Sequence, residues 1–156
     1  MKILGLDPGL SATGYGVIDG RRVIECGVIV TRPQDSLPDR LRQLAQGLEQ
    51  VIRRTRPQRC AVETLFFKRV GAASVLRSAE AAGALLYILS RHHIPVTELT
   101  PATIKLALTG NGRAQKHQVN YMVRVLLGLD GTLHEHAADA LAAAYCLGRR
   151  TKGPTS

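Results

Sequence analysis

The sequence of 156 residues contains no tryptophan, only two phenylalanines and few acidic residues. Asp and Glu together number 12 against 21 Lys and Arg, which gives a formal net charge of +9. Hydrophobic residues make up 45% and charged residues 21%, a globular balance that excludes a disordered or collagen-like chain. A fold does not require this excess of positive charge. The excess therefore indicates a polyanionic partner, and nucleic acid is the first candidate. The alternative explanation of the excess charge is a compositional preference for arginine.

Cysteine is also scarce, and long hydrophobic runs are missing. The three cysteines are widely spaced in apolar surroundings and form no C-x-x-C pair, which predicts buried, reduced thiols in a cytoplasmic protein. No stretch approaches 18 consecutive apolar residues, and the N-terminus carries no signal-peptide pattern. We therefore expect no membrane-spanning segment and no membrane partner.

Five short apolar runs bounded by turn residues predict five β-strands. The first three follow one another closely, and Asp19-Gly20 is a strong hairpin signal, so these strands are expected to pair antiparallel. Helical segments separate the last two strands from the others and from each other. The runs cover residues 3–7, 14–18, 23–30, 60–63 and 95–97. The sequence thus predicts an α/β fold with a mixed five-stranded sheet flanked by helices.

Segments with helical periodicity lie between these strands and after the last one. Ser36 and Asp39 have capping-box spacing, and the apolar residues after them recur at steps of four and three, so the first helix has one apolar face. The second helix is rich in alanine, which would allow close approach of another helix; its buried side is predicted at Val75, Leu76, Ala79, Ala82, Leu86 and Leu89. The helices are expected over residues 37–56, 72–91, 101–108, 114–127 and 135–147.

These elements leave no room for a second domain or a linker. We expect a single domain over residues 1–148. The last residues, 149–156, are polar and basic, and they are expected to form a disordered tail.

The scarce acidic residues fall at positions where chemistry is expected. Asp7 ends the first strand and Glu63 ends the fourth, and ligands of α/β sheets gather at the carboxyl ends of strands. His136 and Asp139 are three apart, so they share one face of the last helix. Each residue also has an ordinary structural explanation, as a turn, an ion-pair partner or a helix-start charge. The combination of all four on a basic protein favours a site.

Three carboxylates gathered without a counter-charge are electrostatically costly. Two Mg²⁺ ions remove that cost, since carboxylate-rich sites suit Mg²⁺, and such a pair hydrolyses phosphodiesters by activating water and stabilising the leaving oxygen. Mn²⁺ is expected to substitute, because a nitrogen ligand such as His136 favours softer divalent ions. A protonated His136 that stabilises the scissile phosphate without binding metal is the alternative role.

Three segments, at residues 5–16, 62–66 and 136–142, resemble in order the motifs of the RuvC family of crossover junction endodeoxyribonucleases. The similarity extends over residues 1–147. It implies a ribonuclease-H-like fold and a Mg²⁺-dependent homodimer that cuts two opposed strands of a Holliday junction in DNA recombination and repair. A partnership with the RuvA and RuvB branch-migration complex is implied by the family alone.

The resemblance also assigns residues to the reaction. Asp7, Glu63 and Asp139 match the family's catalytic, metal-binding carboxylates. Relatives carry either a carboxylate or a histidine at the position of His136, so the family resemblance survives this change. How the metals are held depends on which role His136 plays.

Six residues are candidates for binding DNA: Phe66, Lys68, Arg69, Lys105, Arg113 and Lys116. In the family, the aromatic residue matching Phe66 stacks on unpaired junction bases, and Phe67 is the alternative for that role. Lys105 and Lys116 occupy basic positions of the family. The glycines before Lys116 allow a helix N-terminus to approach phosphate.

Parts of the sequence also fit two other functions. Asp7, Gly9, Thr13 and Gly14 also resemble the phosphate loop of actin-like ATPases and sugar kinases, but 156 residues cannot supply the two domains those enzymes need. A non-catalytic junction-binding module would tolerate loss of the acids, so their presence argues against it. Glu135, which has capping-box spacing from Thr132, is predicted to cap a helix rather than to bind metal.

Overall fold

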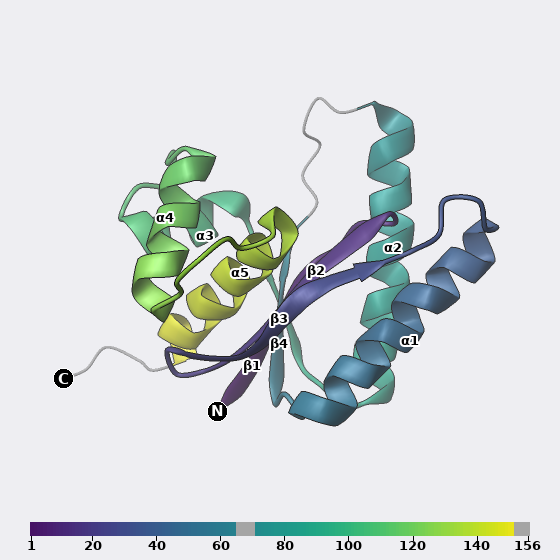
Figure 1. Cartoon of the computed structure of the whole chain (residues 1–156), viewed down its shortest axis with the longest axis horizontal. Coiled ribbons are helices and arrows are strands. Elements are labelled where there is room, and N and C mark those ends of the chain that lie inside the picture. Colours follow the sequence, from purple (N-terminus) through teal and green to yellow (C-terminus); the bar gives the residue numbers. More distant parts are fainter. Residues whose placement is uncertain (65–70, 152–156) are drawn as a thin grey trace.

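A computed structural model describes residues 1–64 and 71–151 and shows one five-stranded sheet between two layers of helices (Figure 1). The strands are β1 (Lys2–Asp7), β2 (Ala12–Asp19), β3 (Arg22–Val30), β4 (Arg59–Glu63) and β5 (Val96–Leu99). Their order in the sheet is β3-β2-β1-β4-β5. The β1–β2 and β2–β3 pairs are antiparallel, whereas β4 runs parallel to both β1 and β5. The predicted mixed sheet is therefore confirmed.

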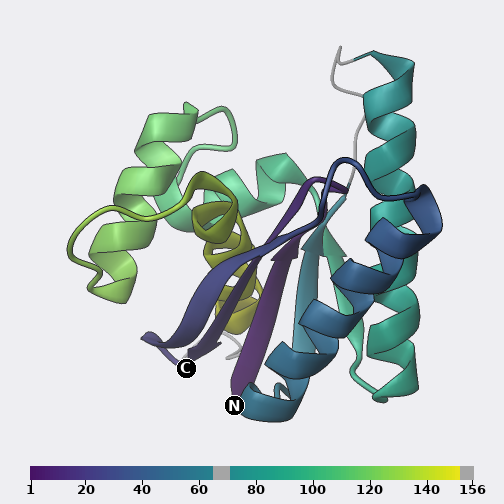
Figure 2. The same cartoon turned by 45° about the vertical axis from the view of Figure 1, so that its right-hand side comes forward.

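In the part of the chain that the structure describes, five helices cover the two faces of this sheet. They are α1 (Leu37–Thr55), α2 (Ala72–Arg91), α3 (Pro101–Thr109), α4 (Lys116–Leu127) and α5 (Glu135–Thr151). Helices α1 and α2 lie on one face, and α3, α4 and α5 lie on the other, as the turned view in Figure 2 makes clear. Each layer has its own hydrophobic core, so the sheet is buried on both sides.

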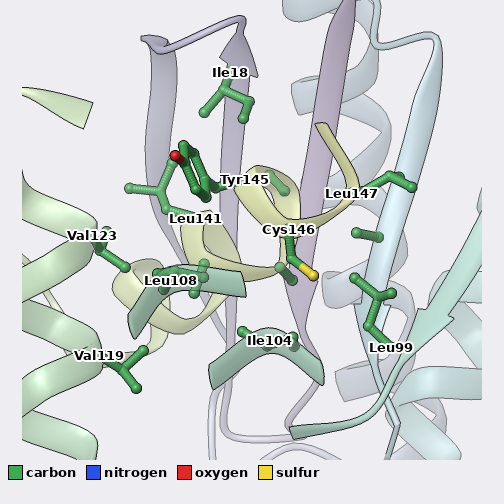
Figure 3. Packing of buried hydrophobic residues seen from close by; sticks show 14 of the residues in the cluster. Ile18, Leu99, Ile104, Leu108, Val119, Val123, Leu141, Tyr145, Cys146 and Leu147 are labelled. Carbon is green, nitrogen blue, oxygen red and sulfur yellow. The ribbon is translucent and has the colours of Figure 1, made fainter. Parts of the chain in front are cut away.

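Helix α5 packs directly on the sheet because glycines stand where it crosses the strands. A β-carbon at Gly5 of β1 would overlap the backbone carbonyl of Ala140, and one at Gly14 of β2 would overlap that of His136. Leu141 and Tyr145 of α5 then fill the core between the sheet and the helices α3 and α4 (Figure 3). The glycines thus allow the first turn of α5 to approach the end of β1.

The predicted N-terminal cap of α1 is confirmed. The Ser36 hydroxyl accepts a hydrogen bond from the Asp39 backbone N–H at 3.3 Å and caps α1 as predicted.

Of the three free cysteines, Cys60 and Cys146 are buried as predicted, while Cys26 is only partly buried.

The buried face of α2 differs from the prediction. The buried residues are Ala81, Leu85, Ile88 and Leu89, whereas Leu76 is 58% exposed; of the predicted set only Leu89 is buried. Apolar residues occupy more than one side of this helix, so periodicity alone could not select the side that packs against α1. Among the described helices, α2 alone is long and apolar enough to cross a membrane by length and composition, and the core helix of a globular protein passes the same test.

The last helix extends further along the chain than expected. Helix α5 continues to Thr151, so the prediction of a disordered tail from residue 149 is wrong for Arg149, Arg150 and Thr151. The two arginines in the last turn interact favourably with the negative end of the helix dipole, which helps the helix to continue. The rest of the predicted tail, residues 152–156, lies outside the described residues.

Candidate active site

Asp7 stands at the end of β1, where a short turn leads into β2. The hydroxyl of the fully buried Thr13 accepts a hydrogen bond from the Gly9 backbone N–H at 3.2 Å and donates one to the Gly9 carbonyl at 2.8 Å. These two bonds fix the turn directly after Asp7. The Asp7 side chain is thus presented at the carboxyl edge of the sheet from a rigid position.

His136 lies against Asp7. Its Nδ1 atom is 2.7 Å from Oδ2 of Asp7. An ionised carboxylate can only accept a hydrogen bond, so the neutral tautomer that fits this contact carries its proton on Nδ1 and has a lone pair on Nε2. The Asp7 carboxylate therefore fixes the orientation of the imidazole in the way that carboxylates orient metal-binding histidines.

The start of α5 is capped differently from the prediction. Nδ1 of His134 accepts a hydrogen bond from the His136 backbone N–H at 3.2 Å, so His134 acts as the cap in place of Thr132. The two imidazole rings stack with their centroids 5.5 Å apart. The ring of His134 therefore packs against the ring of His136.

Asp139 follows His136 on the same face of α5 and is partly buried. Burial raises the pKa of its carboxyl group, the nearby charge of Lys116 opposes this effect, and the negative charge of Asp7 raises the pKa further. Asp7 and Asp139 are thus close enough to repel one another, which is the expected cost of gathering acids in one site.

Glu63 and Asp139 line a common pocket of about 100 Å³. The pocket also contains Lys105 of α3 and Lys116 of α4, and its apolar wall consists of Pro101, Ile104, Val119 and Ala142. The backbone N–H of Thr64 donates to the Leu99 carbonyl at 2.8 Å and continues the pairing of β4 with β5 just beyond Glu63. The strand end that carries Glu63 is therefore well anchored.

Lys116 bridges the pocket to the first turn of α5. Its Nζ atom forms an ion pair with Glu135 and lies 3.3 Å from Oδ2 of Asp139. Burial by itself would lower the pKa of Lys116, but Glu135 and Asp139 together outweigh it and raise the pKa. The same hydrogen bond from Lys116 lowers the pKa of Glu135.

Glu135 is a residue beside the site that sequence reasoning misses, because its spacing from Thr132 predicts a helix cap. Its available signal was the i, i+4 spacing from Asp139, which places both carboxylates on one helix face. The spacing alone could not reveal Lys116 as their common partner.

The remaining candidates for binding DNA fall in two groups. Lys105 lines the pocket, and Arg113 is exposed in the loop before α4, where its backbone N–H donates to Oδ1 of Asn111 at 2.9 Å. The predicted residues Phe66, Lys68 and Arg69, and the alternative Phe67, lie outside the described residues.

The donor chemistry of the site fits Mg²⁺. In the part of the chain that the structure describes, no three His, Cys, Asp or Glu side chains form a group that could hold a metal ion as they stand. Mg²⁺ keeps several waters and binds through one or two carboxylates together with substrate phosphate, so it does not require such a cage. The repulsion between Asp7 and Asp139 is the electrostatic imbalance that a divalent cation relieves.

Sequence comparison identifies close relatives. The family model "Crossover junction endodeoxyribonuclease RuvC" matches residues 3–147. The RuvC protein of Alkalilimnicola ehrlichii is 46% identical, with 93% of this chain and 89% of the relative covered. That of Halorhodospira halophila is 44% identical, with coverages of 98% and 93%.

Solved structures agree with the sequence comparison. The Thermus thermophilus RuvC structure in complex with a Holliday junction substrate superimposes with a TM-score of 0.89 at 34% identity, covering 98% of this chain and 96% of that one. The yeast mitochondrial Holliday junction resolvase Ydc2, at 15% identity and a TM-score of 0.66, shares the fold. The site geometry, the family model and these relatives lead to one conclusion: the chain belongs to the RuvC family of crossover junction endodeoxyribonucleases and has their ribonuclease-H-like fold.

Proposed function

We propose that this chain resolves Holliday junctions in DNA recombination and repair, by metal-dependent hydrolysis of two opposed phosphodiester bonds. One observation carries the proposal. Asp7 and His136 are hydrogen-bonded at 2.7 Å, and the charge of Asp7 acts on Asp139, which shares a pocket with Glu63. An acidic site of this kind in a chain of net charge +9 suits hydrolysis of a polyanion.

Each residue of the site has a role in this chemistry. Asp7, Glu63 and Asp139 supply oxygen ligands for Mg²⁺, with two ions in each site, and His136 supplies a nitrogen ligand through Nε2. Mg²⁺ bound there makes a water molecule more acidic and stabilises negative charge on the scissile phosphate. The hydrogen bond from His136 to Asp7 keeps both side chains oriented before substrate arrives. Mn²⁺ substitutes for Mg²⁺.

The lysines of the pocket bind the DNA backbone. Lys105 and Lys116 present ammonium groups beside Glu63 and Asp139, where they attract the phosphate about to be cut. Arg113, Lys68 and Arg69 are proposed to bind DNA phosphates as well, and Phe66 is proposed to stack on unpaired junction bases.

The enzyme acts as a homodimer, because two symmetric cuts need two sites and one chain carries one. The exposed face of α2 is the interface we propose. Leu76 and Tyr87 are 58% and 65% exposed there. Ala79 and Gly83 between them are small, and a β-carbon at Gly83 would meet no atom within 4 Å. This face allows the same helix of a second copy to approach closely.

Family membership supports two further proposals. A RuvC-type enzyme works on junctions that RuvA and RuvB move along DNA, so these proteins are the partners we expect. Chromosomal DNA as the substrate implies a cytoplasmic location, without a membrane partner.

Cleavage of a synthetic four-way junction tests the proposal. In Mg²⁺, the protein is expected to introduce paired, symmetric nicks in two opposed strands, and to leave a linear duplex of the same sequence uncut. A protein that bound the junction but cut neither substrate in Mg²⁺ or Mn²⁺ would be a junction-binding module instead.

A further inference from the structure

The ammonium group of Lys116 contacts two carboxylates, those of Glu135 and Asp139. Lys116 is the first residue of α4, while Glu135 is the first residue of α5 and Asp139 follows one turn later. Nζ of Lys116 is paired with Glu135 and lies 3.3 Å from Asp139 Oδ2. The lysine therefore competes for the Asp139 carboxylate with any metal ion that binds there.

The two carboxylates differ in their surroundings. The Asp139 side chain is 22% exposed, whereas that of Glu135 is 59% exposed. Water solvates the exposed Glu135 carboxylate, whereas the less exposed Asp139 carboxylate has less water around it to stabilise its charge. Glu135 is thus the better permanent partner for Lys116, and Asp139 is the carboxylate that gains most from a divalent cation.

We propose that Glu135 is a positioning residue: it holds the Lys116 ammonium group so that Asp139 is available to metal while the lysine stays beside the pocket. This inference rests on the proposed function, since it assumes that Asp139 binds metal. An ion pair between exposed side chains is weak, so Glu135 can release Lys116 to a DNA phosphate. Nothing in the family motifs assigns this role, because Glu135 lies just before the third motif.

The measurement is Mn²⁺ binding to the DNA-free protein, followed by the electron paramagnetic resonance signal of free Mn²⁺. In Glu135→Gln, Lys116 is left with Asp139 alone, so the Mn²⁺ dissociation constant is expected to rise roughly two- to five-fold, the range for an exposed ion pair. Glu135→Asp keeps the carboxylate and is expected to restore much of the affinity. Lys116→Met removes the competing cation and is expected to tighten binding.

The decisive comparison is the double variant. In the Lys116→Met background, Glu135→Gln is expected to change Mn²⁺ binding no more than Asp130→Asn does, a control that removes one carboxylate from an exposed position in the loop before α5. Equal weakening by Glu135→Gln with and without Lys116 would overturn the inference, because Glu135 would then act only as a distant negative charge. Unchanged binding in Glu135→Gln would overturn it as well.

These outcomes are separable from failure of the proposed function. A wild-type protein that bound no Mn²⁺ would contradict the metal site itself and, with it, this inference. A wild-type protein that bound Mn²⁺ and cut junctions, with no effect of Glu135→Gln, would contradict only the role of Glu135. Glu135 is exposed, so circular dichroism is expected to show its variants folded as the wild type is.

Discussion

His136 Nδ1 lies 2.7 Å from Asp7 Oδ2, a hydrogen bond between residues 129 positions apart in the sequence. It joins the first turn of α5 to the end of β1. The register of the sheet explains how this is possible, because Asp7 pairs with Gly14 of β2, and the missing side chain of Gly14 leaves room for the backbone of His136. The geometry of the acidic site therefore depends on a glycine outside it.

Gly14→Ala tests this dependence. The new β-carbon would overlap the His136 carbonyl, so α5 must shift at a cost of about 1–3 kcal/mol in unfolding free energy, as for other overpacked sites. Chemical denaturation measures the loss, and junction cleavage is expected to fall with it. Gly112→Ala is the matched control, because its β-carbon would come no closer than 3.4 Å to the Ala102 carbonyl oxygen. Equal stability of the two variants would argue against close packing at Gly14.

His136→Asp separates the two roles of the histidine. If Nε2 binds metal, the aspartate variant is expected to keep cleavage within about ten-fold of wild type. The variant is also expected to show a smaller preference for Mn²⁺ over Mg²⁺ than wild type does, because imidazole favours softer ions than carboxylate does. Cleavage rates in the two metals measure this. A variant that binds junctions but does not cut in either metal would show that His136 acts as a cation.

Lys105→Ala and Lys116→Ala test the phosphate contacts. Each is expected to weaken junction binding and to reduce the slope of log affinity against log salt by about 0.9 per lost contact on duplex DNA. Binding titrations at several salt concentrations give the slope. Lys2→Ala is the control, since Lys2 begins β1 at the opposite edge of the sheet from Asp7. A slope unchanged in both pocket variants would remove these lysines from the DNA surface.

Leu76→Glu tests the dimer interface on α2. A charge placed on this apolar face is expected to shift the protein to monomer in sedimentation velocity and to uncouple the two cuts. Leu106→Glu on α3 is matched in exposure, at 57% against 58% for Leu76, and is expected to leave the dimer intact. If wild-type protein were monomeric at concentrations that resolve junctions, the proposed interface would be wrong.

Much of the acidic site was predictable because its residues carry local signals. Asp7 and Glu63 each end an apolar run, so their positions at the carboxyl edge of the sheet follow from the strand assignments alone. His136 and Asp139 have a spacing that puts them on one helix face. That the strand-end pair lies close to the helix pair depends on the tertiary structure, and only the family resemblance predicts it.

Contacts between distant surface elements were not predictable. Lys116 and Glu135 begin different helices, and nothing local indicates that they meet. The guanidinium group of Arg40 on α1 donates to Thr31 Oγ1 at 2.9 Å and to Ser11 Oγ at 3.1 Å, and no local pattern around Arg40 indicates these partners. These contacts depend on how helices are placed against the sheet, which hydrophobic periodicity does not encode.

Parallel measurements of cleavage and binding by Asp7→Asn, Glu63→Gln and Asp139→Asn test the central claim most directly. Each variant removes a negative oxygen ligand that serves the chemistry, so cleavage of a four-way junction in Mg²⁺ is expected to fall at least about 100-fold, the equivalent of a few kcal/mol of transition-state stabilisation. Junction affinity is expected to stay within a few-fold of wild type, because basic residues supply it. Near wild-type cleavage by any one of the three variants would contradict the account, since that carboxylate could then not be a metal ligand.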